Sequence, residues 1–466
     1  MGERVVIKGA RAIVSCDPSD TLYRGADILV EGPAVVAIGP GLDSGGAEII
    51  DAGGMFVYPG LVNTHHHFFQ TFVRNLAAVD YPSLSVLDWI GKIYEIFKLI
   101  DERAVYYSSL AAMADLLKHG CTCAFDHQYC FPRRAGKRLV DRQMEAASLL
   151  GIRYHAGRGA NTLPKAEGSL IPDEMLETTD EFLADCDRLI GLYHSDEPFR
   201  MTDVVVSPCQ PVNCRRETFV ESVALARDRG VRLHTHLGEG ENAPMLERWG
   251  KRTLAWCEDL GFVGPDVWYA HGWELEPGEY RAMASTGTGL SHCPAPAILG
   301  GFPVLDIPAL GRAGVRLGLG CDGSATNDSS NLLDSLRVAW MMQASRGKER
   351  GGCPSAYDML KIATAGGAGL LGRGDLGSLE PGKAADLFMV DASGLEFAGA
   401  DHDPANFLAR LGATGPVSLT MVNGKVVYEG GRLVGVDEER LAAEAAEACD
   451  GAVRSRSPAY SGYARR

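Results

Sequence analysis

The sequence contains no long apolar run and no surplus of positive charge. No hydrophobic stretch approaches the ~18 residues that a membrane-spanning helix needs, and Met1 to Val5 lack the apolar core of a secretory signal. The 60 Asp and Glu residues outnumber the 45 Lys and Arg residues, which gives a formal net charge of -15. Because nucleic acids and anionic membranes attract basic surfaces, we expect neither as a partner.

Cys-x-x-Cys pairs are also missing, although the chain has 12 cysteines. In a chain of 466 residues this number does not indicate a disulfide framework. Cys121, Cys123 and Cys321 lie in apolar, strand-like runs, where cysteine behaves as a small buried hydrophobe. We therefore expect a reduced, cytoplasmic protein without a zinc-finger site.

Short strand patterns with tight turns occupy both ends of the chain. They include 5–10 and 26–32 near the start, and 385–390 and 420–427 near the end. Neither end is long enough to form a good sheet sandwich alone. We predict one small composite β-sandwich domain from residues 1–57 plus 380–436, followed by a C-terminal helix and tail over 437–466.

Residues 58–379 alternate apolar strand patterns with amphipathic helical patterns, among them 104–118, 217–229 and 332–343. The strand candidates are 56–63, 121–125, 152–156, 204–207, 231–233, 267–270, 288–291 and 315–321. Strand–helix alternation implies a parallel sheet, and eight such units imply a closed (β/α)8 TIM barrel of the α/β class. Most of these strands finish on His, Asp or Arg, at the end where such barrels carry their active sites.

The first of these strand ends carries His65, His66 and His67. Residues two apart in a strand point to the same side, so His65 and His67 can converge on one ion while His66 faces away. Neutral imidazole is a good ligand for zinc or iron. A His-x-His pair alone is weak evidence, because buried or surface histidines are common without a metal.

Four further polar residues follow the later strands: His236, Glu239, His271 and Asp322. Three of them end strands five, six and eight, whereas Glu239 lies three residues beyond His236, where a carboxylate can reach the reacting atoms without binding the metal. His234 lies one layer below His236 and is expected to be a packed, hydrogen-bonded histidine. Unpaired His and acidic groups rarely crowd one barrel mouth, so together they predict a metal site.

Several longer motifs resemble the amidohydrolase superfamily, in its cytosine-deaminase-like branch. They are Pro-Gly-Leu-Val-Asn-Thr-His-His-His at 59–67, His-Thr-His-Leu-Gly-Glu at 234–239, Ala-His-Gly at 270–272, Asp-Gly-Ser-Ala-Thr-Asn-Asp at 322–328 and Leu-Gly-Ser-Leu-Glu-Pro-Gly-Lys-Ala-Ala-Asp-Leu at 376–387. The resemblance spans nearly the whole chain. Within the branch it is similar to 8-oxoguanine deaminases first and to s-triazine hydrolases next.

This resemblance implies a hydrolytic deaminase of an amino-substituted aromatic nitrogen heterocycle: an 8-oxoguanine-like purine, a pterin or a pyrimidine. It implies that His65, His67, His236 and Asp322 hold one divalent metal, zinc or else iron, which activates a water molecule. In this scheme Asp322 takes the proton of the water, Glu239 protonates a ring nitrogen, and His271 orients the nucleophile until ammonia leaves. Relatives commonly dimerise, so a homodimer or a higher homo-oligomer is expected.

Four residues match family positions around the substrate: Gln70, Trp89, Gln128 and Arg158. Their alternative roles are helix capping for Gln70, core packing for Trp89 and an ion pair at the barrel rim for Arg158. Gln128 replaces a histidine of the 8-oxoguanine enzymes, and 291–301 lacks two hydroxyls and an amide of the usual loop. The second change predicts a ligand with fewer polar edges or a more apolar substituent.

Three alternatives to deamination stay open. An s-triazine hydrolase would displace chloride or an alkylamine, although one triazine hydrolase type carries Thr where this chain has Asp322, which favours deamination. A non-catalytic heterocycle-binding relative would need neither Glu239 nor Asp322. A dihydropyrimidinase-like enzyme would carry a carbamylated lysine near Val206 to Cys209, where this chain has none. We therefore expect one metal ion.

Overall fold

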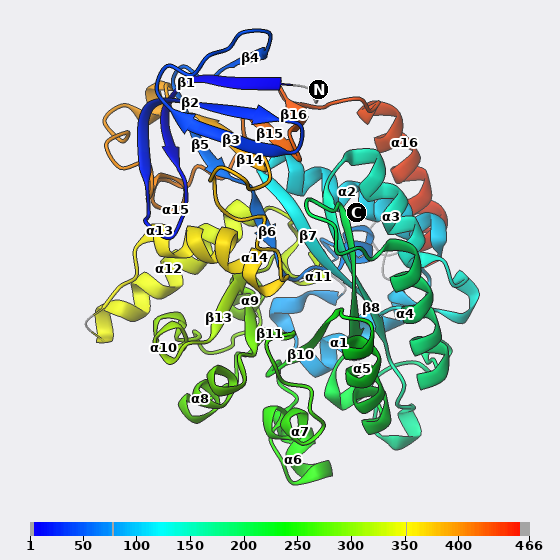
Figure 1. Ribbon diagram of the computed structural model, residues 1–466. Coiled ribbons are helices and arrows are strands. Elements are labelled where there is room, and N and C mark those ends of the chain that lie inside the picture. Colours follow the sequence, from blue (N-terminus) through cyan, green and yellow to red (C-terminus); the bar gives the residue numbers. More distant parts are fainter. Residues whose placement is uncertain (1–3, 77–78, 351, 457–466) are drawn as a thin grey trace.

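A closed barrel of eight parallel strands forms the centre of the molecule (Figure 1). This computed structural model describes residues 4–76, 79–350 and 352–456. The barrel strands are β6 (Leu61–Asn63), β7 (Cys121–Gln128), β8 (Arg153–Ala160), β9 (Thr202–Pro208), β10 (Arg232–Leu237), β11 (Val267–His271), β12 (Gly289–His292) and β13 (Arg316–Leu319). They pair in sequence order, and β13 closes the ring against β6. The predicted (β/α)8 barrel is confirmed.

Helices follow the barrel strands and surround them. They are α1 (Val86–Phe97), α2 (Glu102–Lys118), α3 (Leu139–Leu150), α4 (Thr179–Tyr193), α5 (Arg216–Asp228), α6 (Asn242–Trp249), α7 (Thr253–Asp259), α8 (Pro277–Thr286), α9 (Pro294–Leu299), α10 (Ile307–Ala313), α11 (Ser324–Asn327), α12 (Leu332–Arg350), α13 (Ala356–Lys361) and α14 (Gly367–Leu370). The predicted helices 104–118, 217–229 and 332–343 correspond to α2, α5 and α12. In the described part of the chain, no helix is both long and apolar enough to cross a membrane.

Strands from both ends of the chain form one nine-stranded sheet beside the barrel (Figure 1, blue and orange). Its members are β1 (Arg4–Val14), β2 (Leu22–Glu31), β3 (Ala34–Gly39), β4 (Glu48–Asp51), β5 (Met55–Pro59), β14 (Leu387–Asp391), β15 (Leu419–Val422), β16 (Lys425–Glu429) and β17 (Arg432–Leu433). β5 joins the two halves, because it pairs with β1 on one side and β14 on the other. Ile7 and Ile28 share an apolar core with Leu387 and Met421. The predicted β domain from both termini is confirmed.

The strand predicted over 56–63 is two strands. β5 ends at Pro59 in the terminal sheet, and β6 begins at Leu61 in the barrel. Gly60 lies between them against Thr122: a Cβ at Gly60 would lie 2.0 Å from the hydroxyl oxygen of Thr122. Only glycine permits this close approach. The chain therefore leaves one sheet and enters the other within a single residue, which brings His65 to the rim of the barrel.

Four further elements lie near the site or pack the end of the chain onto the rest of the protein. α1 and the 3-10 helix η1 (Phe68–Val73) follow β6, and residues of both line the site described below. α16 (Glu438–Cys449) packs on α2, where Lys118 pairs with Glu438 at 2.9 Å. The short α15 (Phe407–Leu411) contributes Phe407, whose ring meets that of Phe56 in the terminal sheet.

Candidate metal centre and active site

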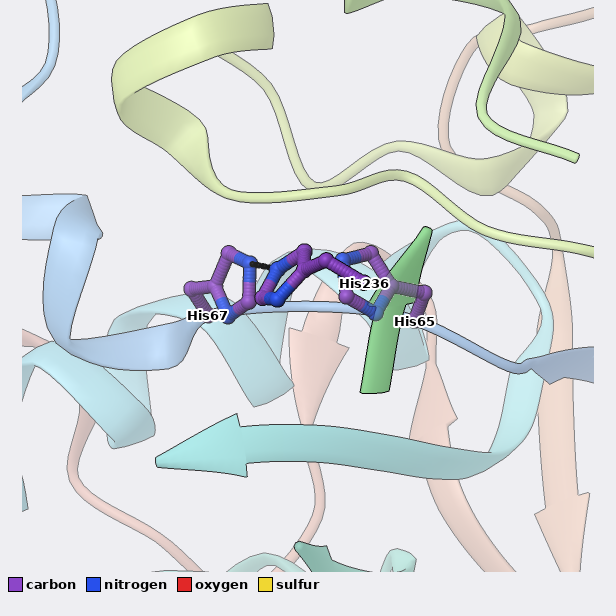
Figure 2. A group of neighbouring side chains, drawn as sticks. All are labelled: His65, His67 and His236. Atoms are coloured by element: carbon purple, nitrogen blue, oxygen red, sulfur yellow. Dashed lines mark hydrogen bonds between the residues drawn. The ribbon is translucent and has the colours of Figure 1, made fainter. Parts of the chain in front are cut away.

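Three histidines converge at the carboxyl end of the barrel (Figure 2). His65 and His67 lie in the turn after β6, and His236 lies in β10. All three are buried, and their ligand atoms lie within 4.8 Å of one another. The Nε2 atoms of His67 and His236 are 3.2 Å apart. Asp322 completes the group, with its Oδ1 3.4 Å from His65 Nε2 and 3.3 Å from His67 Nε2.

Backbone carbonyl groups determine the tautomers of His67 and His236. The Nδ1 of His67 lies 2.9 Å from the carbonyl oxygen of His127, and the Nδ1 of His236 lies 2.6 Å from that of Cys209. A carbonyl oxygen only accepts, so each Nδ1 carries the proton and donates it. The Nε2 atoms of both rings are then left with free lone pairs, and these atoms face each other.

The tautomer of His65, with its proton on Nδ1, is determined by a second histidine, His234. The Nδ1 of His234 donates to the carbonyl oxygen of Trp268 at 3.0 Å, so His234 Nε2 is an acceptor. His65 Nδ1 lies 3.0 Å from that atom and must donate to it. His65 Nε2 is therefore unprotonated, and it has no hydrogen-bond partner among the described residues. His234 lies behind His65, as a hydrogen-bonded support.

This donor set fits a divalent cation. Three imidazole lone pairs and one carboxylate oxygen meet in a buried space, and zinc in proteins takes such nitrogen and oxygen ligands. The hydrogen bonds on the far sides of the rings hold them in place for a metal. Burial lowers the pKa of His65 to about 4, so its ring is neutral and ready to bind at neutral pH. His66 faces away and lies 2.9 Å from the hydroxyl oxygen of Ser330.

His271 and Asp322 both adopt left-handed backbone conformations, with φ of 77° and 63°. Such conformations are unfavourable for residues other than glycine and cost about 1–3 kcal/mol each, and they cluster at functional sites. Here they turn two side chains toward the same space above the barrel. The Nε2 of His271 lies 3.7 Å from the Oε1 of Glu239, and neither ring nitrogen of His271 has a hydrogen-bond partner in the described part of the chain.

Glu239 lies in a tight loop between Gly238 and Gly240, whose φ angles are 71° and 96°. Glu241 holds this loop, because its carboxylate accepts the backbone N–H groups of Gly238 at 2.5 Å and Glu239 at 2.6 Å. Burial raises the pKa of Glu239 well above its usual range, and the charges of Asp322 and Glu241 add to this effect. This environment favours the protonated form of Glu239.

The pKa of Asp322 moves in the opposite direction. Burial alone would raise it, whereas positive charge or a proton on the Nε2 side of His65 and His67 holds it well below its usual range, and with both Nε2 atoms unprotonated a bound cation would supply that charge. A pair of carboxyl groups with opposed pKa shifts is the arrangement that assigns one as the base and the other as the acid. The site can thus keep an anionic Asp322 beside the imidazoles and a protonated Glu239 beside His271.

A small cavity of about 30 Å³ lies between these groups and α1. Its lining includes two of the four predicted substrate residues, Gln70 and Trp89. The other lining residues are His67, Ile90, Tyr94, Tyr129, Cys209, Gln210, His236, Glu239, Asp322 and Thr326. A volume of this size holds about one water molecule, so a heterocycle fits only if some of the lining residues move.

The structure does not bring Gln128 and Arg158 into this cavity. The Gln128 side chain donates to the carbonyl oxygen of Cys130 at 2.7 Å and accepts from Gln143 at 3.3 Å. Arg158 pairs with Glu177 at 2.7 Å and Asp185 at 2.9 Å, away from the cavity lining. These contacts match the alternative role considered for Arg158 from the sequence, an ion pair at the barrel rim.

The loop at 291–301, from which fewer polar contacts with the ligand were expected, does not line the cavity. Residues 295–301 include most of α9, and no residue of that stretch lines the cavity. Ala297 instead packs in a separate apolar cluster with Trp273, Cys293 and Met342. The loss of polar side chains in this loop therefore acts on packing beside His271 rather than on the cavity wall.

Tyr129 and Gln210 are among the polar residues of the cavity wall that the sequence analysis missed. Tyr129 lies directly after β7; its hydroxyl accepts a hydrogen bond from Gln70 at 3.1 Å, and its ring meets that of His67 at 4.8 Å. Gln210 follows β9 and donates to Glu239 at 3.3 Å. Both lie just past a barrel strand end, and this position is the signal that would have identified them.

Comparison with known proteins agrees with this geometry. A profile of the amidohydrolase family matches residues 56–427. The chain is 52% identical over 457 residues to hydroxydechloroatrazine ethylaminohydrolase of Pseudomonas sp. strain ADP, which covers 96% of this chain and 94% of that protein. It is 35% identical over 445 residues to 8-oxoguanine deaminase of Pseudomonas aeruginosa, which covers 94% and 97%. The crystal structure of atrazine chlorohydrolase from Arthrobacter aurescens TC1 complexed with zinc superposes with a TM-score of 0.91 at 32% identity, over 96% of this chain and 100% of that one.

Proposed function

Because this chain belongs to the amidohydrolase family and is a hydrolase of C–N bonds, we propose that it removes an amino or alkylamino group from an aromatic nitrogen heterocycle, with one zinc ion. One observation carries this proposal: three imidazole Nε2 atoms and Asp322 meet beside a buried carboxyl group, Glu239, whose pKa is raised. A binding protein would need neither carboxyl group.

His65, His67, His236 and Asp322 would hold the metal. A bound zinc ion supplies the Lewis acidity that makes water a nucleophile at neutral pH. Asp322 stays ionised, and Thr326 donates to its Oδ2 at 3.2 Å, so the carboxylate is fixed as a proton acceptor. Glu239 donates a proton from its Oε1 side to a ring nitrogen of the substrate, which makes the neighbouring carbon electrophilic. His271, on the same side of Glu239, orients the attacking oxygen.

The part of the cavity lining that α1 provides favours a substrate with an alkylamino substituent. Trp89, Ile90 and Tyr94 of α1 present mostly apolar surface to the cavity. Trp89 Nε1 has no hydrogen-bond partner among the described residues, so it can donate to an oxygen or a ring nitrogen of the ligand. The relative with 52% identity is named for the ethylamino group of a hydroxylated atrazine, and this agrees with an apolar roof over a polar ring. Ammonia release from an oxopurine or a pterin is the second candidate, supported by the deaminase relatives.

A panel of substrates separates these leaving groups. The zinc-loaded protein is incubated with an ethylamino-hydroxytriazine, 8-oxoguanine, isoxanthopterin and a chlorotriazine, and ethylamine, ammonia and chloride are measured, with metal content determined on the same sample. We expect release of ethylamine or ammonia with one zinc ion per chain. Release of chloride alone would contradict the proposed leaving group, two ions per chain would contradict the single-metal site, and no turnover at all would indicate a non-catalytic relative.

We also propose that the chain works as a homodimer or higher homo-oligomer in the cytoplasm. All 12 cysteines are free, and 11 of them are buried, which agrees with a reducing compartment. Analytical ultracentrifugation of the purified protein measures the oligomeric state, and a monomer at micromolar concentration would exclude the proposed assembly.

A further inference from the structure

Gln210 and Asn213 connect the catalytic loop to the backbone through two side-chain amides. The Nε2 of Gln210 donates to the Oε2 of Glu239 at 3.3 Å, and the Nδ2 of Asn213 donates to the Oε1 of Gln210 at 3.2 Å. Both amides are buried, at 3% and 1% exposure. They lie on and beside the 3-10 helix η7 (Pro211–Asn213), just past the end of β9.

The orientation of both amides follows from a backbone N–H group. The N–H of Leu170 lies 3.3 Å from the Oδ1 of Asn213, and an N–H group only donates. The hydroxyl of Ser169 accepts from the N–H of Ile171 and donates to the same Oδ1 at 3.1 Å. This end of Asn213 must therefore be its oxygen, so its NH2 group faces Gln210. Gln210 must in turn offer its oxygen to Asn213 and its NH2 group to Glu239.

The orientation of the Gln210 amide determines which oxygen of Glu239 carries the proton. A neutral carboxyl group has one carbonyl oxygen, which is a good acceptor, and one hydroxyl oxygen, which is the donor. Because Oε2 accepts the N–H of Gln210, it is the carbonyl oxygen, and the proton belongs on Oε1. Oε1 is the oxygen that lies 3.7 Å from His271. The proton is thus held on the side where the reacting atoms lie.

We infer that Gln210 and Asn213 are positioning residues that place the transferable proton of Glu239 on Oε1. This inference rests on the proposed function, because it assumes that Glu239 donates a proton during turnover. Gln210 contacts Glu239, Asn213 contacts Gln210, and the N–H group of Leu170, outside the cavity, sets the orientation of both amides. Without them, Glu239 could carry the proton on either oxygen, and only one of these orientations is productive.

The test compares the wild type with Gln210→Met, which removes the N–H donor at similar volume, and with Asn213→Asp. The carboxylate introduced by Asn213→Asp accepts only, so Gln210 turns its NH2 group toward it and presents its oxygen to Glu239, which moves the proton to Oε2. We expect kcat to fall about 10- to 100-fold in both variants, with KM and zinc content nearly unchanged. Gln343→Met is the matched control, since Gln343 is a buried glutamine that donates to the Leu305 carbonyl outside the site, and it keeps wild-type kcat.

Isotope-edited infrared spectra of the zinc-loaded protein give a readout independent of turnover. A hydrogen bond to the acid carbonyl of Glu239 lowers its stretching frequency, so Gln210→Met raises that frequency, and Glu239→Gln identifies the band by removing it. An unchanged kcat and an unchanged band in Gln210→Met would overturn the inference, as would a fall in kcat that follows a loss of zinc. A wild type without turnover on any substrate would instead contradict the proposed function.

Discussion

At the scale of single residues, the site depends on two carboxyl groups in different surroundings. Asp322 lies beside the Nε2 atoms of His65 and His67, where a bound cation would stabilise its charge, whereas Glu239 is buried near other acids, which disfavour its charge. In the proposed reaction, the same chemical group would therefore act as a base in one place and as an acid in the other. Both lie in backbone segments that depart from regular structure, Asp322 at a positive φ and Glu239 between two glycines.

The first prediction concerns Glu239→Gln, which keeps the shape of the side chain and removes its proton-donating hydroxyl. We expect kcat to fall about 100- to 10,000-fold while zinc content is retained, because Glu239 is not a ligand. In the wild type, activity falls as the pH rises through the raised pKa of Glu239, since only the protonated form donates. The residual activity of the variant does not show this fall in activity at high pH, which is the basic limb of the pH profile. Steady-state rates across pH measure both effects, and an unchanged basic limb would show that another group donates.

At the scale of elements, α1 forms the roof of the site. Ser85 caps its N-terminus by accepting the N–H of Asp88 at 3.2 Å, and the apolar side of the helix faces inward. Trp89 meets the rings of Tyr81 and Phe97 edge-on, so the roof is held by aromatic packing rather than by charges.

The second prediction concerns Trp89→Phe, which keeps an aromatic ring and removes the indole N–H. If this group donates to the substrate, KM rises about 3- to 10-fold, the range expected for one hydrogen bond. Trp249→Phe on α6 is the control, because Trp249 is 42% exposed and lies outside the cavity lining, and its KM stays at the wild-type value. Substrate titrations at fixed zinc compare the two, and equal KM values for both variants would remove Trp89 from substrate binding.

At the scale of the whole molecule, a buried ion pair links the segment that leads into the terminal sheet to the barrel. Arg153 at the start of β8 binds Asp386 through two contacts, at 2.7 and 3.0 Å. Asp386 also accepts the N–H of Asn423 at 2.7 Å, just after β15. Arg153 is fully buried, and Asp386 is the carboxylate that pairs with its guanidinium group.

The third prediction is that Asp386→Ala lowers the free energy of unfolding by about 3–5 kcal/mol, because it leaves the guanidinium of Arg153 buried without its carboxylate. Glu48→Ala removes an exposed carboxylate from the same sheet and should change stability by less than about 0.5 kcal/mol. Urea denaturation followed by circular dichroism measures both. Similar midpoints for the two variants would mean that the ion pair does not fasten the sheet.

Much of this protein follows from its sequence alone. The apolar runs that end on His65, His236, His271 and Asp322 predict both the barrel and the rim where these residues meet, because strand period and strand direction are local properties of the chain. The family resemblance adds a role for each of these residues, and membership of the family is confirmed over residues 56–427.

Only the tertiary structure decided the cavity wall and its supports. Gln128 and Arg158 lie near the carboxyl ends of β7 and β8, as the proposed metal ligands lie near the ends of theirs, yet their side chains bind Gln143 and Glu177, from other segments, and do not line the cavity. The contact of Gln210 with Glu239 likewise joins residues 29 positions apart. The direction of a polar side chain depends on which partners the fold brings near it, and neither local periodicity nor spacing contains that information.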